Sequence, residues 1–193
     1  MQCFISVVGN PDKDGSPPMV LGTFCTSPDT TRFSWDVAVQ KARTALFFSD
    51  DTRAFSARTV GFLAQRFYPP GIKDTQPGIF LGLQEHYSNF NYNVQNPLND
   101  AINNDPTKLV LARVPMNPNL PNGITIFPGG FPLYRNGVLI GGVGVSGDGI
   151  DQDDIVAASG ASAFPAPREI RADRFSYRGA RLPYAKFPRN PAL

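Results

Sequence analysis

The chain has 193 residues, of which 41% are hydrophobic and 18% are charged, and its formal net charge is +2. These values are typical of one folded domain and exclude a disordered chain, because disordered chains combine low hydrophobicity with high net charge. No run of about 18 consecutive apolar residues occurs, so a membrane-spanning helix is not expected. Met1 leads directly into strand-like sequence without the pattern of a signal peptide, so we expect no signal peptide here.

The first two elements are expected to be strands, at residues 3–8 and 19–26. If they pair with Val8 opposite Val20, then Cys3 lies opposite Cys25 and a cross-strand disulfide is geometrically feasible. Two buried, unpaired thiols are the alternative, and we favour them. A disulfide would indicate an oxidising compartment such as the bacterial periplasm, and without one the sequence leaves periplasm and cytoplasm open.

Two helices are expected next, one covering residues 36–48 and opened by Ser34 or Asp29, the other covering residues 56–67. Their apolar faces are expected to consist of Trp35, Val39, Ala42 and Leu46 in the first helix and Val60, Leu63 and Phe67 in the second. Lys41 and Arg43 are expected on the polar side of the first helix. Residues 87–105 are expected to form a long polar loop, followed by a strand at residues 109–114.

The stretch at residues 127–154 specifies a strand, a tight turn, a glycine-rich strand and a helix. Asn136-Gly137 favours a two-residue type I′ turn, because both central positions of that turn need a positive φ. Glycine weakens a strand, so the glycines that follow the turn indicate close packing on the strand backbone. Asp151 or a neighbouring aspartate is expected to cap the helix, and a calcium loop is not favoured because its ligand spacing is absent.

Residues 164–193 differ from the rest of the chain, since they carry seven basic and two acidic residues and are rich in proline and aromatic residues. We expect an extended arm that lies over its own domain or a neighbouring subunit, with arginines reaching carboxylate or carbonyl groups. A nucleic-acid partner is not favoured, because the basic residues are too sparse. The expected organisation is therefore a domain of residues 1–163 followed by this C-terminal arm.

Three sequence blocks are distinctive: DVAVQKARTALFF at residues 36–48, SDDTRAFSARTVGFLAQRFYPPG at residues 49–71, and PGGFPLYRNGVLIGGVGVSGDGIDQDD at residues 128–154. Together, in this order, they resemble the GlcG/HbpS-like haem-binding domain family. With the elements above, the resemblance implies one α/β layered domain that is profilin- or PAS-like in outline. Its sheet is expected to be largely antiparallel, with about five strands and with helices packed on it. The resemblance also implies binding of haem or another tetrapyrrole, and self-association.

Five residues are candidates for contact with haem. His86 is the single histidine of the chain and the candidate iron ligand, with a solvated loop histidine as the alternative. Arg43 and Arg58 are candidate partners of the haem propionates, although a solvated helix face explains them as well. Phe131 and Tyr134 are candidates for a flat wall against the ring, with packing in the core as the alternative.

The expected function is non-enzymatic binding of haem or a similar small molecule by a self-associating domain. The alternative is an accessory subunit that binds no cofactor and docks on a larger protein assembly through the C-terminal arm. Haem degradation or another redox activity is implied by the name of the family alone, and no residue is assigned a catalytic role. The sequence has no CxxCH motif for covalent haem and no nucleophile elbow.

Overall fold

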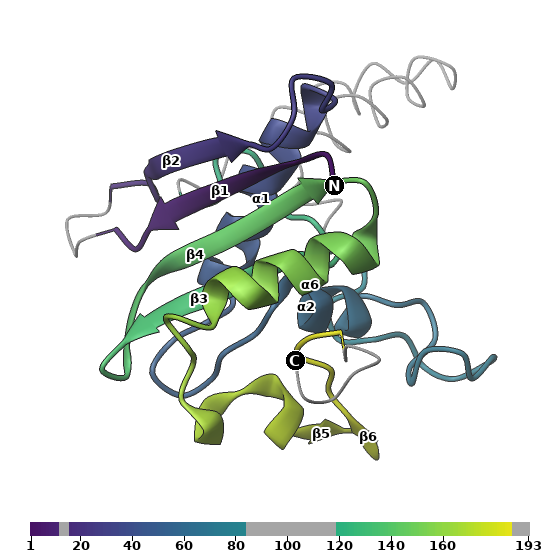
Figure 1. The fold of residues 1–193 in the computed structure, drawn as a ribbon. Coiled ribbons are helices and arrows are strands. Elements are labelled where there is room, and N and C mark those ends of the chain that lie inside the picture. The colour runs from purple at the N-terminus through teal and green to yellow at the C-terminus, as the bar shows by residue number, and fades with distance from the viewer. Residues whose placement is uncertain (12–15, 84–118, 187–193) are drawn as a thin grey trace, which may run out of the picture.

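Antiparallel strands form the main sheet of the computed structural model, which describes residues 1–11, 16–83 and 119–186 (Figure 1). The strands are β1 (Cys3–Gly9), β2 (Val20–Cys25), β3 (Gly130–Arg135) and β4 (Val138–Gly147), in the spatial order β2-β1-β4-β3. The main helices are α1 (Phe33–Phe47), α2 (Ala57–Leu63) and α6 (Ile150–Ala161). The expected class, an α/β layered domain with a largely antiparallel sheet, is confirmed; the main sheet has four described strands, and the strand expected at residues 109–114 lies outside the described residues.

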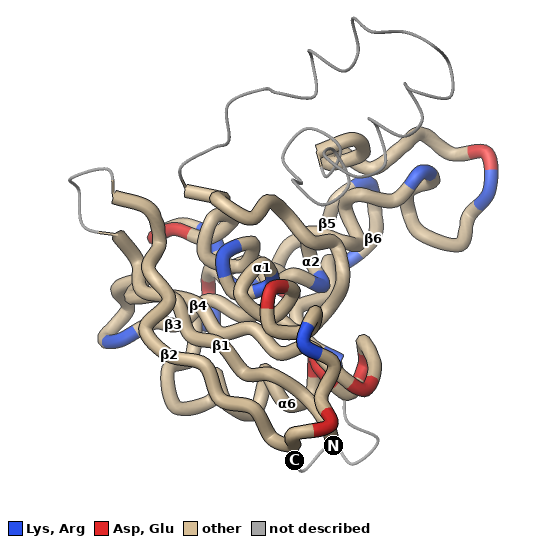
Figure 2. Tube along the Cα trace, turned by 90° about the horizontal axis from the view of Figure 1, so that it is seen from above, with Lys and Arg blue, Asp and Glu red and all other residues tan. Residues whose placement is uncertain are grey.

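Helices α1 and α6 lie on opposite faces of the sheet (Figure 1). On the α6 face, Cys3 and Val145 pack with Ala157 of the helix, whereas Val8 packs with Val39 on the α1 face. This alternation follows from the pleat, which directs successive side chains of a strand to opposite faces. Strands β1, β2 and β4 carry no charged residue, so the charges of the described chain lie mainly on the helices and connections (Figure 2).

The glycines of β4 allow α1 to lie directly on the strand backbone. A methyl group at Gly144 would overlap the carbonyl oxygen of Ala38, and one at Gly142 would overlap that of Ala42. The expected close packing on this strand is therefore confirmed. The turn before it has φ values of 52° at Asn136 and 81° at Gly137, as the Asn-Gly pair predicts for a type I′ hairpin.

The β1–β2 pairing separates the two cysteines. Val8 lies opposite Val20 as expected, but a bulge shifts the register beyond this pair, so that Cys25 lies opposite Phe4. A shift of one residue turns a side chain to the other face of the sheet. Cys3 is buried on the α6 face, Cys25 is exposed, and both are free. The expectation of a buried thiol is confirmed for Cys3 and is wrong for Cys25.

The helix boundaries differ from the expected ones. Helix α1 begins at Phe33, between the two expected starts, Asp29 and Ser34, and no side chain caps it. Trp35 is 50% exposed rather than part of the buried stripe. Helix α2 is capped by Ser56 and Thr59, which exchange hydrogen bonds between side chain and backbone, and it ends at Leu63. No helix among the described residues is long and apolar enough to cross a bilayer.

Helix α6 begins after Gly149, and no side chain caps it. The expected cap by Asp151 or a neighbour is therefore wrong. Asp153 and Asp154 turn inward and are buried, although both lie in the first turns of the helix. Their acidic groups pair with basic side chains from other elements, as described below.

The C-terminal segment folds back beside α2 and α6 (Figure 1). It contains the 3-10 helices η2 (Arg168–Ile170) and η3 (Ala172–Arg174) and a ribbon of β5 (Ser176–Tyr177) with β6 (Ala180–Arg181). Ala166, Ala172 and Leu182 are buried in it, and the backbone of Ala54 exchanges hydrogen bonds with the backbone of this segment. Residues 164–186 therefore pack on their own domain, and the expected division after residue 163 stays a prediction.

Candidate functional site

A buried ion pair joins α1 to α6. Lys41 is 1% exposed and its Nζ lies 2.8 Å from Oδ2 of Asp153. The same ammonium donates to the carbonyl oxygen of Val145 at 2.8 Å, while Oδ1 of Asp153 has no partner among the described residues. Burial lowers the pKa of Lys41, and the hydrogen bond to Asp153 opposes that shift. The expectation that Lys41 lies on the polar side of its helix is wrong.

A second ionic group surrounds Asp154, beside the first. Arg58 Nε lies 2.8 Å from Asp154 Oδ2, and Arg58 Nη2 lies 2.8 Å from Asp151 Oδ1. The backbone N–H of Gly129 donates to Asp154 Oδ1 at 3.0 Å. The carboxylates of α6 thus hold the guanidinium of α2 in place, and Arg58 is engaged by protein groups on two sides.

The remaining candidate residues lie in different parts of the molecule. Arg43 donates to the carbonyl oxygen of Pro18 and to Asn122 Oδ1. Tyr134 is buried, its hydroxyl donates to the carbonyl oxygen of Asp50 at 2.9 Å, and burial raises its pKa well above the usual value. His86 lies outside the described residues, so its role as iron ligand stays a prediction.

Phe131, unlike Arg43 and Tyr134, lines a pocket described below. This pocket, here called the α6 pocket, has a volume of about 290 Å³ and lies between β3, α6 and the C-terminal segment. A neighbouring cavity of about 260 Å³, the α2 pocket, is lined by Phe62 and Leu182 among others. Arg171, Tyr184 and Ala185 line both pockets, so the C-terminal segment separates them.

Tyr184 stands between the two pockets. Its ring packs edge-on against Phe131 with centroids 5.3 Å apart, and the Arg171 guanidinium lies 5.1 Å from the Tyr184 ring centroid. Arg171 also forms two hydrogen bonds with the carboxylate of Asp173, from Nε at 3.0 Å and from Nη2 at 2.6 Å. Burial raises the pKa of Tyr184, and the positive charge of Arg171 opposes that shift.

Neither Arg171 nor Tyr184 was among the candidate residues predicted from the sequence. The signal available was the basic, proline- and aromatic-rich composition of residues 164–193, which indicates a covering arm without showing which side chains point inward. The pairing of Tyr184 with Phe131 joins residues that are far apart in the chain, and no local pattern predicts such a contact.

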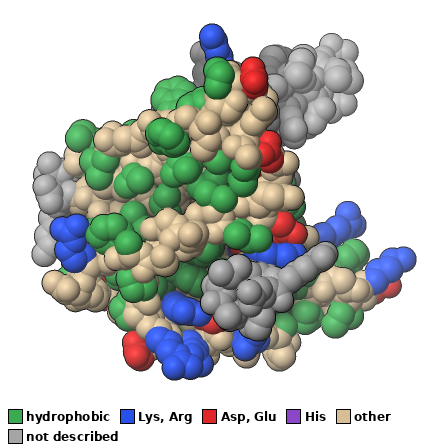
Figure 3. Space-filling view, viewed as in Figure 1, with side chains coloured by type: hydrophobic (Ala, Val, Ile, Leu, Met, Phe, Trp, Pro, Cys, Tyr) green, Lys and Arg blue, Asp and Glu red, His purple; other side chains and the backbone are tan. Residues whose placement is uncertain are grey.

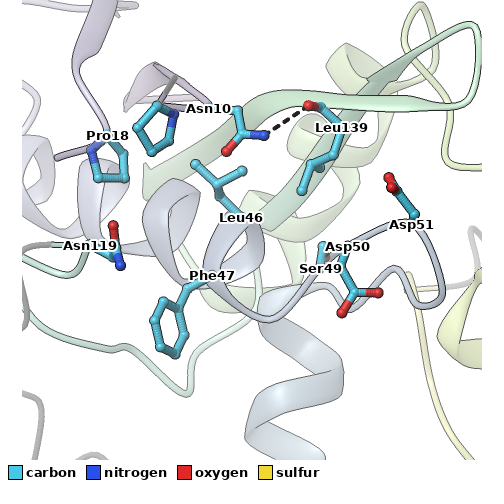
Figure 4. A pocket seen from close by; sticks show the side chains of 10 residues that line it. Asn10, Pro18, Leu46, Phe47, Ser49, Asp50, Asp51, Asn119 and Leu139 are labelled. Atoms are coloured by element: carbon cyan, nitrogen blue, oxygen red, sulfur yellow. Dashed lines mark hydrogen bonds between the residues drawn. The ribbon is translucent and has the colours of Figure 1, made fainter. Parts of the chain in front are cut away.

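A third cavity lies elsewhere, at the C-terminal end of α1, with a volume of about 430 Å³ (Figure 4). Leu46 and Leu139 form part of its wall, and Asn10 donates to the carbonyl oxygen of Leu139 at 2.9 Å. The charged residues among those that line it are Asp50 and Asp51, which repel an anionic ligand. Among the described residues no group of three or more His, Cys, Asp or Glu is placed to hold a metal ion.

Three solved structures resemble the described fold. A PduOC:heme complex is 22% identical, with a TM-score of 0.51 over 86% of this chain and 80% of that chain. The Klebsiella pneumoniae protein ORFY is 22% identical, with a TM-score of 0.47 over 86% and 77% of the two chains. A double mutant of Streptomyces reticuli HbpS is 18% identical, with a TM-score of 0.37 over 85% and 72%. At 22% identity, the likeness to the PduOC:heme complex shows the fold alone.

No curated protein matches the sequence significantly. A model of the family described as "Haem degrading protein HbpS-like", by contrast, matches residues 19–162, which is most of the chain. This span contains the three sequence blocks, the ion pair of α1 with α6 and the glycine-rich strand. The chain therefore belongs to the HbpS-like family.

Proposed function

We propose that this protein binds haem or another tetrapyrrole in the α2 and α6 pockets. Membership of a family named for haem supports this proposal, and one similar fold was solved as a heme complex. The observation that carries it is the pair of neighbouring pockets with aromatic walls that share one arginine. Tetrapyrrole sites are largely apolar and need few polar groups to orient the ligand.

The residues present fit such a ligand. Phe131 offers an aromatic surface to a flat ring, and Ala158 and Pro132 leave the surrounding wall apolar. Arg171 is the basic residue common to both pockets. Asp173 occupies its Nε and Nη2, so Nη1 has no hydrogen-bond partner among the described residues and is available for a propionate. His86 stays the predicted iron ligand, since imidazole is a common ligand of haem iron.

A titration with hemin, followed by the Soret absorbance, tests the proposal. The variant Arg171→Ala is expected to weaken binding about tenfold, which corresponds to about 1.4 kcal/mol, because it removes the charge that pairs with a propionate. The matched control is Arg168→Ala, because Arg168 is a nearby but exposed arginine and lines neither pocket.

Parallel titrations with metal-free protoporphyrin IX separate ring packing from iron ligation. His86→Ala is expected to alter the Soret band of bound hemin while leaving protoporphyrin binding intact. Equal affinities for Arg171→Ala and Arg168→Ala, or no binding of either tetrapyrrole by the wild type, would contradict the proposal. A Soret band that remains stable with ascorbate in air is the result expected of a binder rather than a haem-degrading enzyme.

Self-association is a further part of the proposal. Strand β2 lies at one edge of the sheet, all six of its residues are exposed, and none is charged. Leu21 and Phe24 are each 64% exposed. Hydrophobic side chains gather over β1 and β2, on the side of the sheet that carries α6 and beyond the part that this helix covers (Figure 3). Uncharged edges of this kind pair readily with another strand. Sedimentation velocity is expected to show a dimer or larger species, and a monomer at all concentrations would contradict this part.

A further inference from the structure

Residues 183–186, here called the strap, form the part of the C-terminal segment that divides the proposed site. Tyr184 and Ala185 belong to the strap and line both the α2 and the α6 pocket. Each pocket alone is smaller than the range of about 300–1,000 Å³ typical of sites for small ligands. With the strap in place, neither pocket has room for a whole tetrapyrrole.

The strap is held on the α2 side by hydroxyl groups. Thr59 Oγ1 donates to the carbonyl oxygen of Pro183 at 2.6 Å, and Ser56 Oγ donates to that of Tyr184. Both hydroxyls already belong to the cap of α2, where each accepts from a backbone N–H group and their oxygens lie 3.0 Å apart. If the strap leaves, one hydroxyl can donate to the other and the second can donate to the water that replaces the strap, so the cost of an unsatisfied buried polar group stays small.

The strap is held on the α6 side by carboxylates. The backbone N–H of Lys186 donates to Asp154 Oδ2 at 2.7 Å, and its Nζ lies 2.8 Å from Asp151 Oδ2. Asp154 is buried, yet it keeps Arg58 and the N–H of Gly129 when Lys186 leaves. Loss of an ion-pair partner is costly when it leaves a buried charge unpaired. Removing the strap leaves no buried charge unpaired, so this cost does not arise.

The strap has a fixed point of attachment just before it. Leu182 is buried, and its N–H donates to the carbonyl oxygen of Phe175 at 2.9 Å. By contrast, the described strap residues take part in no strand of either sheet, and side chains of the domain supply the hydrogen bonds to their backbone. Movement about Pro183 would withdraw the Tyr184 ring from Phe131 and Arg171 and join the two pockets.

We propose that the strap is a gate: it closes the site in the free protein, and its release joins the two pockets and admits the tetrapyrrole. This inference rests on the proposed function. It assigns to Tyr184 the role of a plug and to Lys186 the role of a clasp. The apparent affinity and the association rate are then limited by the fraction of molecules whose strap is open.

Stopped-flow mixing with hemin tests the gate. Tyr184→Ala removes the plug and Lys186→Ala removes the bond to Asp151, so both are expected to raise the association rate constant. The rise is about tenfold if the strap is open in roughly one molecule in ten. Tyr184→Phe is the matched control for the plug, since no described residue hydrogen bonds to the Tyr184 hydroxyl, and exposed Lys73→Ala is the control for the clasp. Both controls are expected to bind at the wild-type rate.

Hydrogen–deuterium exchange of the ligand-free protein gives a second measurement. The strap amides are expected to exchange far faster than those of β4, and hemin is expected to change strap exchange specifically. Strap amides as protected as β4, or wild-type association rates in Tyr184→Ala and Lys186→Ala, would overturn the gate while leaving haem binding intact. Failure of hemin to bind any of these variants would instead contradict the proposed function, and the exchange experiment would still decide whether the strap opens.

Discussion

At the scale of single residues, the buried ion pair of Lys41 with Asp153 is an interaction that the sequence does not predict. Lys41 and Asp153 lie 112 positions apart in the chain, yet they pair in the core between α1 and α6. Helical periodicity places Lys41 among polar neighbours, and only the docking of α6 supplies its counter-ion. The same holds for the candidate haem contacts: the residue types of Arg58 and Tyr134 are read directly from the sequence, but their hydrogen-bond partners are not.

Replacing Lys41 by methionine is expected to destabilise the fold by about 3–5 kcal/mol, because it leaves the Asp153 carboxylate buried and unpaired. Combining it with Asp153→Leu is expected to recover much of this loss, since a well-packed apolar pair removes the buried charge. Urea unfolding provides the measurement, and Lys73→Met, at an exposed position, serves as the control. A single Lys41→Met variant as stable as this control would show that the pair contributes nothing.

Alkaline pH is expected to destabilise the protein through Tyr134. Burial raises its pKa, so above the ordinary tyrosine pKa of about 10 the unfolded chain loses a proton that the folded chain keeps. This contribution to stability is complete below that pH and is lost as the pH rises. Tyr134→Phe is expected to be about 1 kcal/mol less stable at neutral pH, because it lacks the bond to Asp50. Between about pH 9 and 11, the unfolding free energy of Tyr134→Phe is expected to fall by less than that of the wild type. Parallel curves of unfolding free energy against pH would contradict this.

At the scale of elements, local signals predicted well and long-range ones did not. The two residues Asn136-Gly137 suffice to predict the turn geometry. The glycines of β4 predict that another element packs closely on the strand, but they do not show which element it is. The bulge that sends Cys25 to the opposite face from Cys3 has no comparable signal, because register depends on what both faces of the strand contact. Helix α2 likewise ends at Leu63, although the apolar spacing continues to Phe67. The periodicity of apolar residues does not show at which residue a helix stops packing on the rest of the domain.

Gly144→Ala tests the contact of α1 with β4. The added methyl group would overlap the carbonyl oxygen of Ala38, so the helix must shift, at an expected cost of about 1–3 kcal/mol. Gly160→Ala is the matched control, because Gly160 lies in α6 with open space around its α-carbon. The control is expected to be neutral or to stabilise by up to about 1 kcal/mol. Thermal unfolding separates the two, and equal melting temperatures would contradict the close contact.

At the scale of the whole molecule, the C-terminal segment divides into a part that completes the fold and a part that covers the site. Residues 164–182 contribute buried side chains and hydrogen bonds to the backbone of Ala54 and Tyr134. Composition predicted an arm over the domain, but it could not separate these two roles, because prolines and arginines occur throughout. The division depends on which residues the domain buries.

Two truncations test this division. A chain ending at Leu182 is expected to keep its circular dichroism spectrum and cooperative thermal unfolding, because the groups that bind the strap retain other partners. A chain ending at Ala163 is expected to unfold at a much lower temperature or to be insoluble, because Tyr134 and Ala54 lose their backbone partners and the core around Leu63 loses Ala172 and Leu182. Equal stability of the two truncated chains would show that the fold is complete at residue 163.

The exposed thiol of Cys25 has a practical consequence. The sequence contains two cysteines, and the other one, Cys3, is buried, so a maleimide dye is expected to attach at Cys25 alone in the native protein. The dye would sit on β2, on the strand through which we expect copies of the chain to meet. Its emission would then report assembly directly as the protein is diluted, without any engineered attachment point.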